Sequence, residues 1–147
     1  MYRPFAMPLI AAIMLGAACA VADADVGRTP EGVWYSVGGI GDEESARIAL
    51  DSVNHALSLR LAARGSGAYL ADVDLRIVDA DQRRVFQRHL DGPWLLIDLP
   101  PGRYEIVGEH EGEVARLDVV VPEHGRRSAV MYFPVQGEVR PFREEQP

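Results

Sequence analysis

The sequence predicts a mainly β domain, an antiparallel sandwich of about seven strands with one N-terminal helix packed on it. Three observations predict this fold. Short segments after residue 57 alternate apolar and polar side chains, turn residues separate these segments at an even spacing, and only residues 42–54 repeat at a helical period. A parallel sheet, which needs a helix between successive strands, is therefore not expected. The 147 residues suffice for one such domain.

Composition argues against several classes of protein. The formal net charge is −7, from 15 basic and 22 acidic side chains, whereas a non-specific nucleic-acid binder needs clustered cations. All of the basic residues are arginine, which we attribute to coding bias rather than to function. The single cysteine, Cys19, excludes an internal disulfide and a cysteine-based zinc site.

The segment Met1–Ala22 has the composition of a secretory signal peptide. Arg3 supplies a positive charge, an apolar run follows over Pro8–Ala18, and small residues lie where a signal peptidase cleaves. The run is too short to span a bilayer comfortably, so we expect a periplasmic or secreted mature chain with no transmembrane helix. Gly16–Cys19 offers an alternative, because it resembles a bacterial lipobox, in which Cys19 would carry a lipid anchor.

The chain after this segment begins with a polar stretch and one helix. Residues 23–32 include two glycines and a proline, which predicts a flexible leader. A short strand follows at Val33–Val37, and Asp42 then caps a helix that extends to Asn54. One apolar face of this helix is expected to pack on the sandwich, namely Ala46, Ala49, Leu50, Val53 and Leu57.

Further segments have the pattern of half-buried strands. They are residues 57–62, 73–77, 84–90, 94–99, 104–110, 114–121 and 128–133, and the turns between them are rich in glycine, proline and aspartate. Trp94–Leu99 is apolar on both faces, which is typical of a central strand. The domain therefore extends over residues 33–133, and the polar residues 134–147 form a C-terminal tail.

A tight turn follows the central strand. Pro101 fixes φ near the value that a turn requires, and Gly102 permits a positive φ. Leu99 and Tyr104 flank this turn and are expected to pack beneath it. Tyr104 is accordingly interpreted as a corner residue rather than a catalytic phenol, and Trp94 as a buried ring.

The residues around this turn resemble a known family. Asp91–Ile106 is similar to the signature of carboxypeptidase regulatory-like domains, also called prealbumin-like or transthyretin-like. Glu111-Gly112 and Val119–Pro122 match the hairpin and the strand that follow in that family. The resemblance extends to small secreted proteobacterial proteins. It implies an immunoglobulin-like sandwich in an exported protein, with the Trp94 ring pointing inward, and it implies no chemistry.

We expect neither catalysis nor a cofactor. The same sandwich hosts 5-hydroxyisourate hydrolase, which makes a transthyretin-related hydrolase one alternative, but the C-terminal Tyr-Arg-Gly-Ser of that enzyme is missing here. A metal-dependent hydrolase is another alternative. Its candidate ligands are His89 and His110, because they lie on strands that could be neighbours, with Glu109 or Glu111 nearby.

Two kinds of binding protein are the main hypotheses. The first recognises another protein of the cell envelope, by an edge strand or by the Gly65–Tyr69 loop, where a tyrosine beside glycines is typical of a binding loop. In the competing interpretation, Tyr69 covers the apolar face of the helix. The second is a carbohydrate-binding module that uses Trp34, Tyr35 and Tyr69, with Asp72 accepting sugar hydroxyls. Because Trp34 and Tyr35 are adjacent in a strand, at most one of them can join such a platform.

Overall fold

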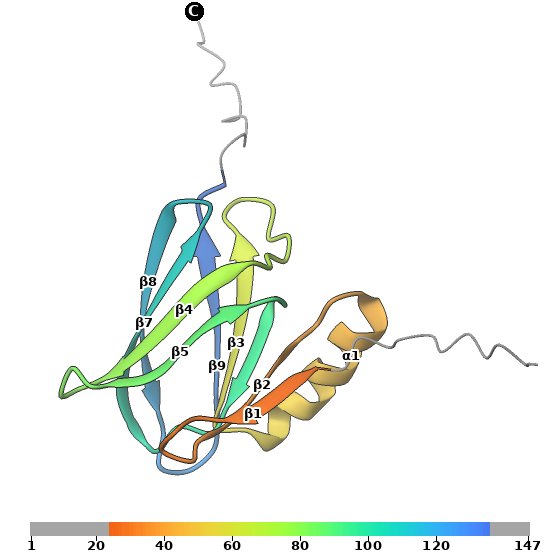
Figure 1. Cartoon of the computed structure of the whole chain (residues 1–147). Helices are drawn as coiled ribbons and strands as arrows, with labels where there is room; N and C mark the ends of the chain where they lie inside the picture. Colours follow the sequence, from red (N-terminus) through yellow and green to blue (C-terminus); the bar gives the residue numbers. More distant parts are fainter. Residues whose placement is uncertain (1–23, 136–147) are drawn as a thin grey trace, which may run out of the picture.

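The computed structural model describes residues 24–135, which form two β-sheets packed face to face and one helix (Figure 1). Sheet A has five strands in the order β1 (Asp25–Arg28), β2 (Trp34–Gly38), β6 (Trp94–Ile97), β3 (Leu57–Ala63) and β9 (Arg127–Phe133). Sheet B has four strands in the order β5 (Arg84–Leu90), β4 (Val73–Asp79), β7 (Gly102–His110) and β8 (Glu113–Val121). One helix, α1 (Asp42–Asp51), continues as a 3-10 turn over Ser52–Asn54. The predicted mainly β class with one helix is confirmed, but these residues form nine strands and not about seven.

The two ends of the chain lie outside the described residues. The expected signal peptide Met1–Ala22, with its Cys19, falls there, and so does the expected tail 134–147 apart from Pro134 and Val135. Within residues 24–135, no helix has both the length and the apolar character that crossing a bilayer would require.

Strand β1 corrects the expectation of a flexible leader over residues 23–32. It pairs antiparallel with β2 along its whole length. The Asp25 carboxylate also pairs with the Arg88 guanidinium on β5, which ties sheet A to sheet B at this edge. Backbone hydrogen bonds and an ion pair hold β1 in place, with little apolar burial. The sequence pattern, which reports apolar burial, therefore did not reveal this strand.

Strand β9 corrects the expectation that every strand is antiparallel. It pairs in parallel with β3, from Leu57 opposite Arg127 to Ala63 opposite Phe133. A parallel pair requires a long connection, and strands β4 to β8 supply it in place of a crossover helix. The lack of a second helical pattern in the sequence was therefore not sufficient to exclude a parallel pair.

Apolar side chains from both sheets fill the space between them. Strand β6 is buried on both faces, as its sequence predicted. Leu95 and Ile97 belong to the core between the sheets, whereas Trp94 and Leu96 pack with Ile48 of α1 on the outer face of sheet A. The Trp94 ring is thus buried, at 6% exposure, but it lies under the helix and not between the sheets as the resemblance implied.

Helix α1 lies on the outside of sheet A, against β2 and β6 (Figure 1). Its buried residue is Ile48, whereas Leu50 and Val53 of the predicted apolar face are 76% and 51% exposed. The prediction was therefore wrong for Ala46, Leu50 and Val53, whereas Ala49 packs beside Ile48 and Leu57 is buried in the core. The extent of the helix, with its terminal 3-10 turn, agrees with the predicted residues 42–54.

The contacts at the start of α1 explain this orientation. Gly41, with φ of 85°, precedes the helix, and Asp42 is its first residue and not its cap. The Ser45 hydroxyl donates a 2.6 Å hydrogen bond to the Gly39 carbonyl, and Glu44 accepts one of 3.0 Å from the backbone N–H of Ile40. These bonds tie the first turn to the end of β2 and thereby set which side of α1 meets the sheet.

The turn over Pro100–Gly102 has a buried tyrosine beneath it. The Tyr104 hydroxyl donates a 2.6 Å hydrogen bond to the Pro100 carbonyl, an arrangement typical of the tyrosine corner in β-sandwiches. Leu99 and Tyr104 are 3% and 7% exposed and belong to the core between the sheets. Gly102 has φ of 154°, a backbone conformation that residues with side chains rarely adopt.

Candidate functional site

Two half-exposed tyrosines lie in one row across the outer face of sheet A. Ala62 on β3 forms an isolated antiparallel bridge with Tyr69 and lies opposite Tyr132 on β9. Paired residues of neighbouring strands point to the same face, so the two tyrosines flank Ala62 at a separation of about two strand spacings, or ~9.6 Å. Tyr69 is 50% exposed and Tyr132 is 49% exposed, whereas Ala62 between them is 3% exposed.

Arg60 lies in the neighbouring row of the same face, between Trp94 on β6 and Val130 on β9. Its guanidinium carbon is 5.3 Å from the centre of the Trp94 ring, a cation–π arrangement. The Tyr69 ring meets Trp94 edge-on, with ring centres 6.5 Å apart and planes at 70°. We call Arg60, Tyr69, Trp94 and Tyr132 the tyrosine surface.

The tyrosine surface has the composition of a binding site. Tyrosine offers a ring and a hydroxyl at low cost in side-chain entropy, and arginine offers several donors in a rigid fork. Tyr69 contacts Trp94 at the margin of the helix-covered cluster and still leaves half of its surface to solvent. The Tyr69 ring therefore packs by one edge on Trp94 of β6 and is accessible to solvent elsewhere.

The other candidate aromatic residues lie apart from this surface. Tyr35 is 8% exposed in the core, where its ring meets Phe86 edge-on and its hydroxyl accepts a 2.7 Å hydrogen bond from Arg88. Trp34 points to the opposite face of β2, as the alternation predicted. It lies beside Asp98, after the end of β6, whereas Tyr69 lies beside Trp94 at the start of β6. Trp34, Tyr35 and Tyr69 therefore do not form one sugar-stacking platform.

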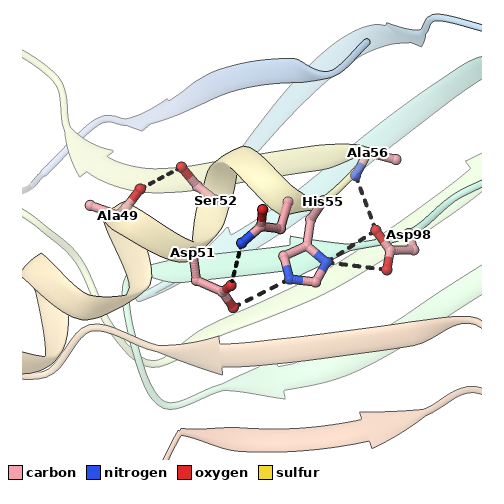
Figure 2. Close-up of polar contacts among 7 residues, drawn as sticks. Ala49, Asp51, Ser52, His55, Ala56 and Asp98 are labelled. Atoms are coloured by element: carbon pink, nitrogen blue, oxygen red, sulfur yellow. Dashed lines mark hydrogen bonds and ion pairs between the residues drawn. The ribbon is translucent and has the colours of Figure 1, made fainter. Parts of the chain in front are cut away.

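His55 stacks on Trp34. Figure 2 shows its ring between Asp51 at the end of α1 and Asp98, which follows β6. The two rings stack with centres 4.2 Å apart and planes at 8°. Nδ1 of His55 lies 3.1 Å from both carboxylate oxygens of Asp98, and Nε2 lies 3.3 Å from Oδ2 of Asp51. Asp98 also accepts a 3.0 Å hydrogen bond from the backbone N–H of Ala56. This cluster locks the helix to the sheet.

The carboxyl groups of this cluster differ in their partners. Asp51 accepts a 3.1 Å hydrogen bond from the Asn54 side chain, and this bond, followed by the contact with His55, lowers the pKa of Asp51 below its ordinary value. Both ring nitrogens of His55 thus face carboxylates. No sequence pattern indicated this cluster, because His55 and Asp98 are far apart in the chain and come together only when β3 pairs with β6.

His89 lies at another cluster of carboxylates, on the outer side of β5. Its Nδ1 is 2.8 Å from Oδ1 of Asp74, and its Nε2 is 3.3 Å from Asp72 and 3.6 Å from Asp91. Hydrogen bonds to Asp74 and then to Asp72 raise the pKa of the imidazole above its ordinary value. Asp72, with φ of 57°, has the left-handed conformation that aspartate tolerates better than most residues.

The predicted metal pair of His89 and His110 does not come together as one set of ligands. His110 is 9% exposed, faces the backbone carbonyl of Asp72 at 3.3 Å, and packs edge-on against Phe133. Within residues 24–135, the one group of three donor atoms close enough to share a metal ion is Asp72, His89 and Asp91, all of them exposed. A metal ion would have to displace the proton that the carboxylates favour on His89.

We expect the His89 cluster to give a pH-dependent contribution to stability. Because its pKa is raised in the folded chain, the contribution is complete below the unfolded value of about 6.5 and is lost as pH rises through the folded pKa. NMR titration of the His89 ring protons in Asp74→Asn should show a lower pKa than in the unmodified chain. Asp118→Asn, a distant carboxylate, is the control. An unchanged His89 titration in Asp74→Asn would contradict this assignment.

Two members of the tyrosine surface were not expected from the sequence. Arg60 alternates with the buried Leu59 and Leu61, and Tyr132 alternates with the buried Met131 and Phe133. The alternation therefore indicated that both side chains point away from the core. Only the parallel register of β3 and β9 brings them to one surface with Tyr69.

Comparisons with known proteins add little to this geometry. No protein-family model matches the chain, and no curated protein sequence matches it. One similar solved structure is described as "Crystal Structure of S.CueP". It is 8% identical, the match covers 52% of this chain and 62% of that chain, and the TM-score is 0.41. The match thus spans less than two thirds of that protein, and at this TM-score it supports no statement about function.

Proposed function

We propose that this protein is a non-enzymatic, exported β-sandwich module that binds another protein of the cell envelope through the tyrosine surface. In this proposal the sandwich is of the carboxypeptidase regulatory-like type, which the Pro100–Gly102 turn above Tyr104 supports. The proposed compartment is the periplasm or the cell exterior after cleavage of Met1–Ala22, with a lipid anchor at Cys19 as the alternative.

One observation carries the proposal. Tyr69 and Tyr132 are each about half exposed on a sheet face, and Arg60 beside them has no hydrogen-bond or ion-pair partner for its guanidinium within residues 24–135. Tyrosine and arginine are enriched among the residues that contribute most to protein–protein binding. Elsewhere on sheet A, α1 and His55 already cover the large side chains of the outer face.

Alanine substitutions of the two tyrosines test the proposal. Tyr69→Ala and Tyr132→Ala should each lower the unfolding free energy by about 1 kcal/mol or less, because half of each ring is already in water and an aromatic edge contact contributes about 0.5–1.5 kcal/mol. Each should reduce by tenfold or more the amount of specific partner that the immobilised full chain captures from envelope extract, measured by quantitative mass spectrometry.

Val114→Ala is the matched control, because Val114 is 53% exposed on sheet B. It should capture as much partner as the unmodified chain. The proposal is wrong if Val114→Ala and Tyr69→Ala reduce capture equally. It is also wrong if Tyr69→Ala costs more than about 1.5 kcal/mol of unfolding free energy and leaves capture unchanged, since the ring would then be a packing residue.

A further inference from the structure

The environment of Arg60 sets it apart from the paired arginines of the molecule. Arg47, Arg88 and Arg116 have side chains at least 40% exposed, and each faces a carboxylate. Arg60 is partly buried, and among the described residues no hydrogen bond or ion pair engages its guanidinium. Its Nε is fully buried and has no acceptor. Among the described arginines Arg60 is therefore the one that is partly withdrawn from water, and it has no counter-charge there.

Such an arrangement is energetically incomplete. A cation that is withdrawn from water without an anion or an acceptor is destabilising, and a buried N–H without a partner costs about 1–3 kcal/mol. The Trp94 ring compensates part of this cost by the cation–π contact. An aromatic ring does not accept the directional hydrogen bonds that a guanidinium offers, so the donors of the two terminal nitrogens, which unlike Nε are not buried, are still available.

The sheet around Arg60 contains no group that could supply the missing charge. Its neighbours on the same face, read from the strand register, are uncharged: Trp94, Leu96, Ser58, Ala62, Ser128, Val130 and Tyr132. A carboxylate is the natural partner, since arginine binds it through two parallel N–H···O bonds. Among the described residues no ion pair joins Arg60 to a carboxylate, which leaves this position to a binding partner.

We infer that the tyrosine surface takes an acidic polypeptide segment, one aspartate or glutamate of which pairs with Arg60. This inference rests on the proposed function and names the chemistry of the partner. Tyr69 and Tyr132 would lie on the two sides of the bound segment and exclude water from the ion pair. A segment with uncharged side chains in place of the acid would leave the Arg60 donors unpaired and would bind more weakly.

Two side-chain N–H groups report directly on this surface. The ¹⁵N-labelled full chain is titrated with an acetylated, amidated hexapeptide of alternating glutamate and valine, while the Arg60 Nε–H and the Trp94 indole N–H are followed by NMR. We expect saturable shifts of the Arg60 signal, and at least fivefold weaker binding of the same peptide with glutamine in place of glutamate. Equal binding of the two peptides would overturn the inference.

Arg60→Met and Arg60→Lys are the matched variants. Methionine keeps a long apolar stem without charge and should abolish the preference for the glutamate peptide, followed on the Trp94 signal. Lysine keeps the charge without the fork and should retain part of the preference. The midpoint of thermal unfolding should not fall in Arg60→Met, because an uncompensated cation has been removed. A large fall, with the glutamate preference intact in Arg60→Met, would show that Arg60 is a packing residue.

The outcomes separate this inference from the proposed function. If Tyr69→Ala loses capture of the envelope partner and Arg60→Met retains it fully, the tyrosine surface binds a protein but the acidic segment is wrong. If Tyr69→Ala retains capture, the proposed function itself fails.

Residues 136–147 include Glu138, Glu144 and Glu145. If the peptide binds only after these three are replaced by glutamine, the occupant is the chain's own C-terminal segment and the inferred partner is wrong.

Discussion

Tyr104→Ala is expected to lower the free energy of unfolding by about 3–5 kcal/mol, the usual loss when a buried aromatic ring is truncated to a methyl group. The ring is 7% exposed and lies in the core between the sheets, below the turn that joins β6 to β7. The substitution leaves a cavity and also removes the 2.6 Å hydrogen bond to the Pro100 carbonyl. Urea unfolding followed by circular dichroism measures the change.

Tyr104→Phe separates the hydroxyl from the ring. Burial, and to a smaller extent the nearby charge of Asp79, raise the pKa of the Tyr104 phenol, and the hydroxyl donates to Pro100. Removal of the hydroxyl alone should cost about 1 kcal/mol, the net value of one such bond. If Tyr104→Ala costs no more than Tyr104→Phe, the ring does not stabilise the turn.

Gly92→Ala should be almost as damaging, at about 3 kcal/mol or more, because of backbone contact. A Cβ atom at Gly92 would meet the carbonyl oxygen of Gly38 and would lie 2.7 Å and 2.9 Å from its carbonyl carbon and Cα. These atoms belong to the strand that pairs with β6, so they cannot move without separating β2 from β6. Thermal unfolding should show a drop of several degrees in the midpoint.

Gly67→Ala is the control for this substitution. Gly67 has φ of 72° and no atom within 4 Å of an added Cβ, so only its backbone conformation opposes a side chain. The cost there should be about 1–2 kcal/mol, the penalty for a left-handed residue with a Cβ. If Gly67→Ala lowers the unfolding free energy more than Gly92→Ala does, the close contact between β2 and the β5–β6 turn is not what requires glycine at position 92.

Local patterns in the sequence predicted those parts of the fold that local physics determines. The two-sided burial of Trp94–Ile97 and the turn over Pro100–Gly102 follow from hydropathy and from the backbone preferences of proline and glycine. The residues at which the helix begins and ends could also be predicted. Which side of the helix faces the sheet could not be predicted, because hydrogen bonds of Ser45 and Glu44 with the preceding loop determine it.

The candidate site could be predicted only in part from the sequence, for a related reason. Tyr69 stood out because it follows two glycines, whereas Arg60 and Tyr132 are ordinary outward residues of two strands. The parallel pairing of β3 with β9 unites them, and register between distant strands leaves no trace in either segment alone. The proximity of His55 to Asp98 has the same origin.

The pairing of β3 with β9 also bears on the order in which the chain folds. Strands β4 and β5, and likewise β7 and β8, are hairpins between neighbours in the sequence, so their loops close at little entropic cost. Sheet A instead joins segments from opposite ends of the described chain, and its β3 edge stays open until residues 127–133 arrive. Contacts of such long range slow folding. Until β9 arrives, the backbone N–H and C=O groups along this edge of β3 are unpaired and can bind a strand of another chain, which makes the closure of sheet A the step most exposed to aggregation.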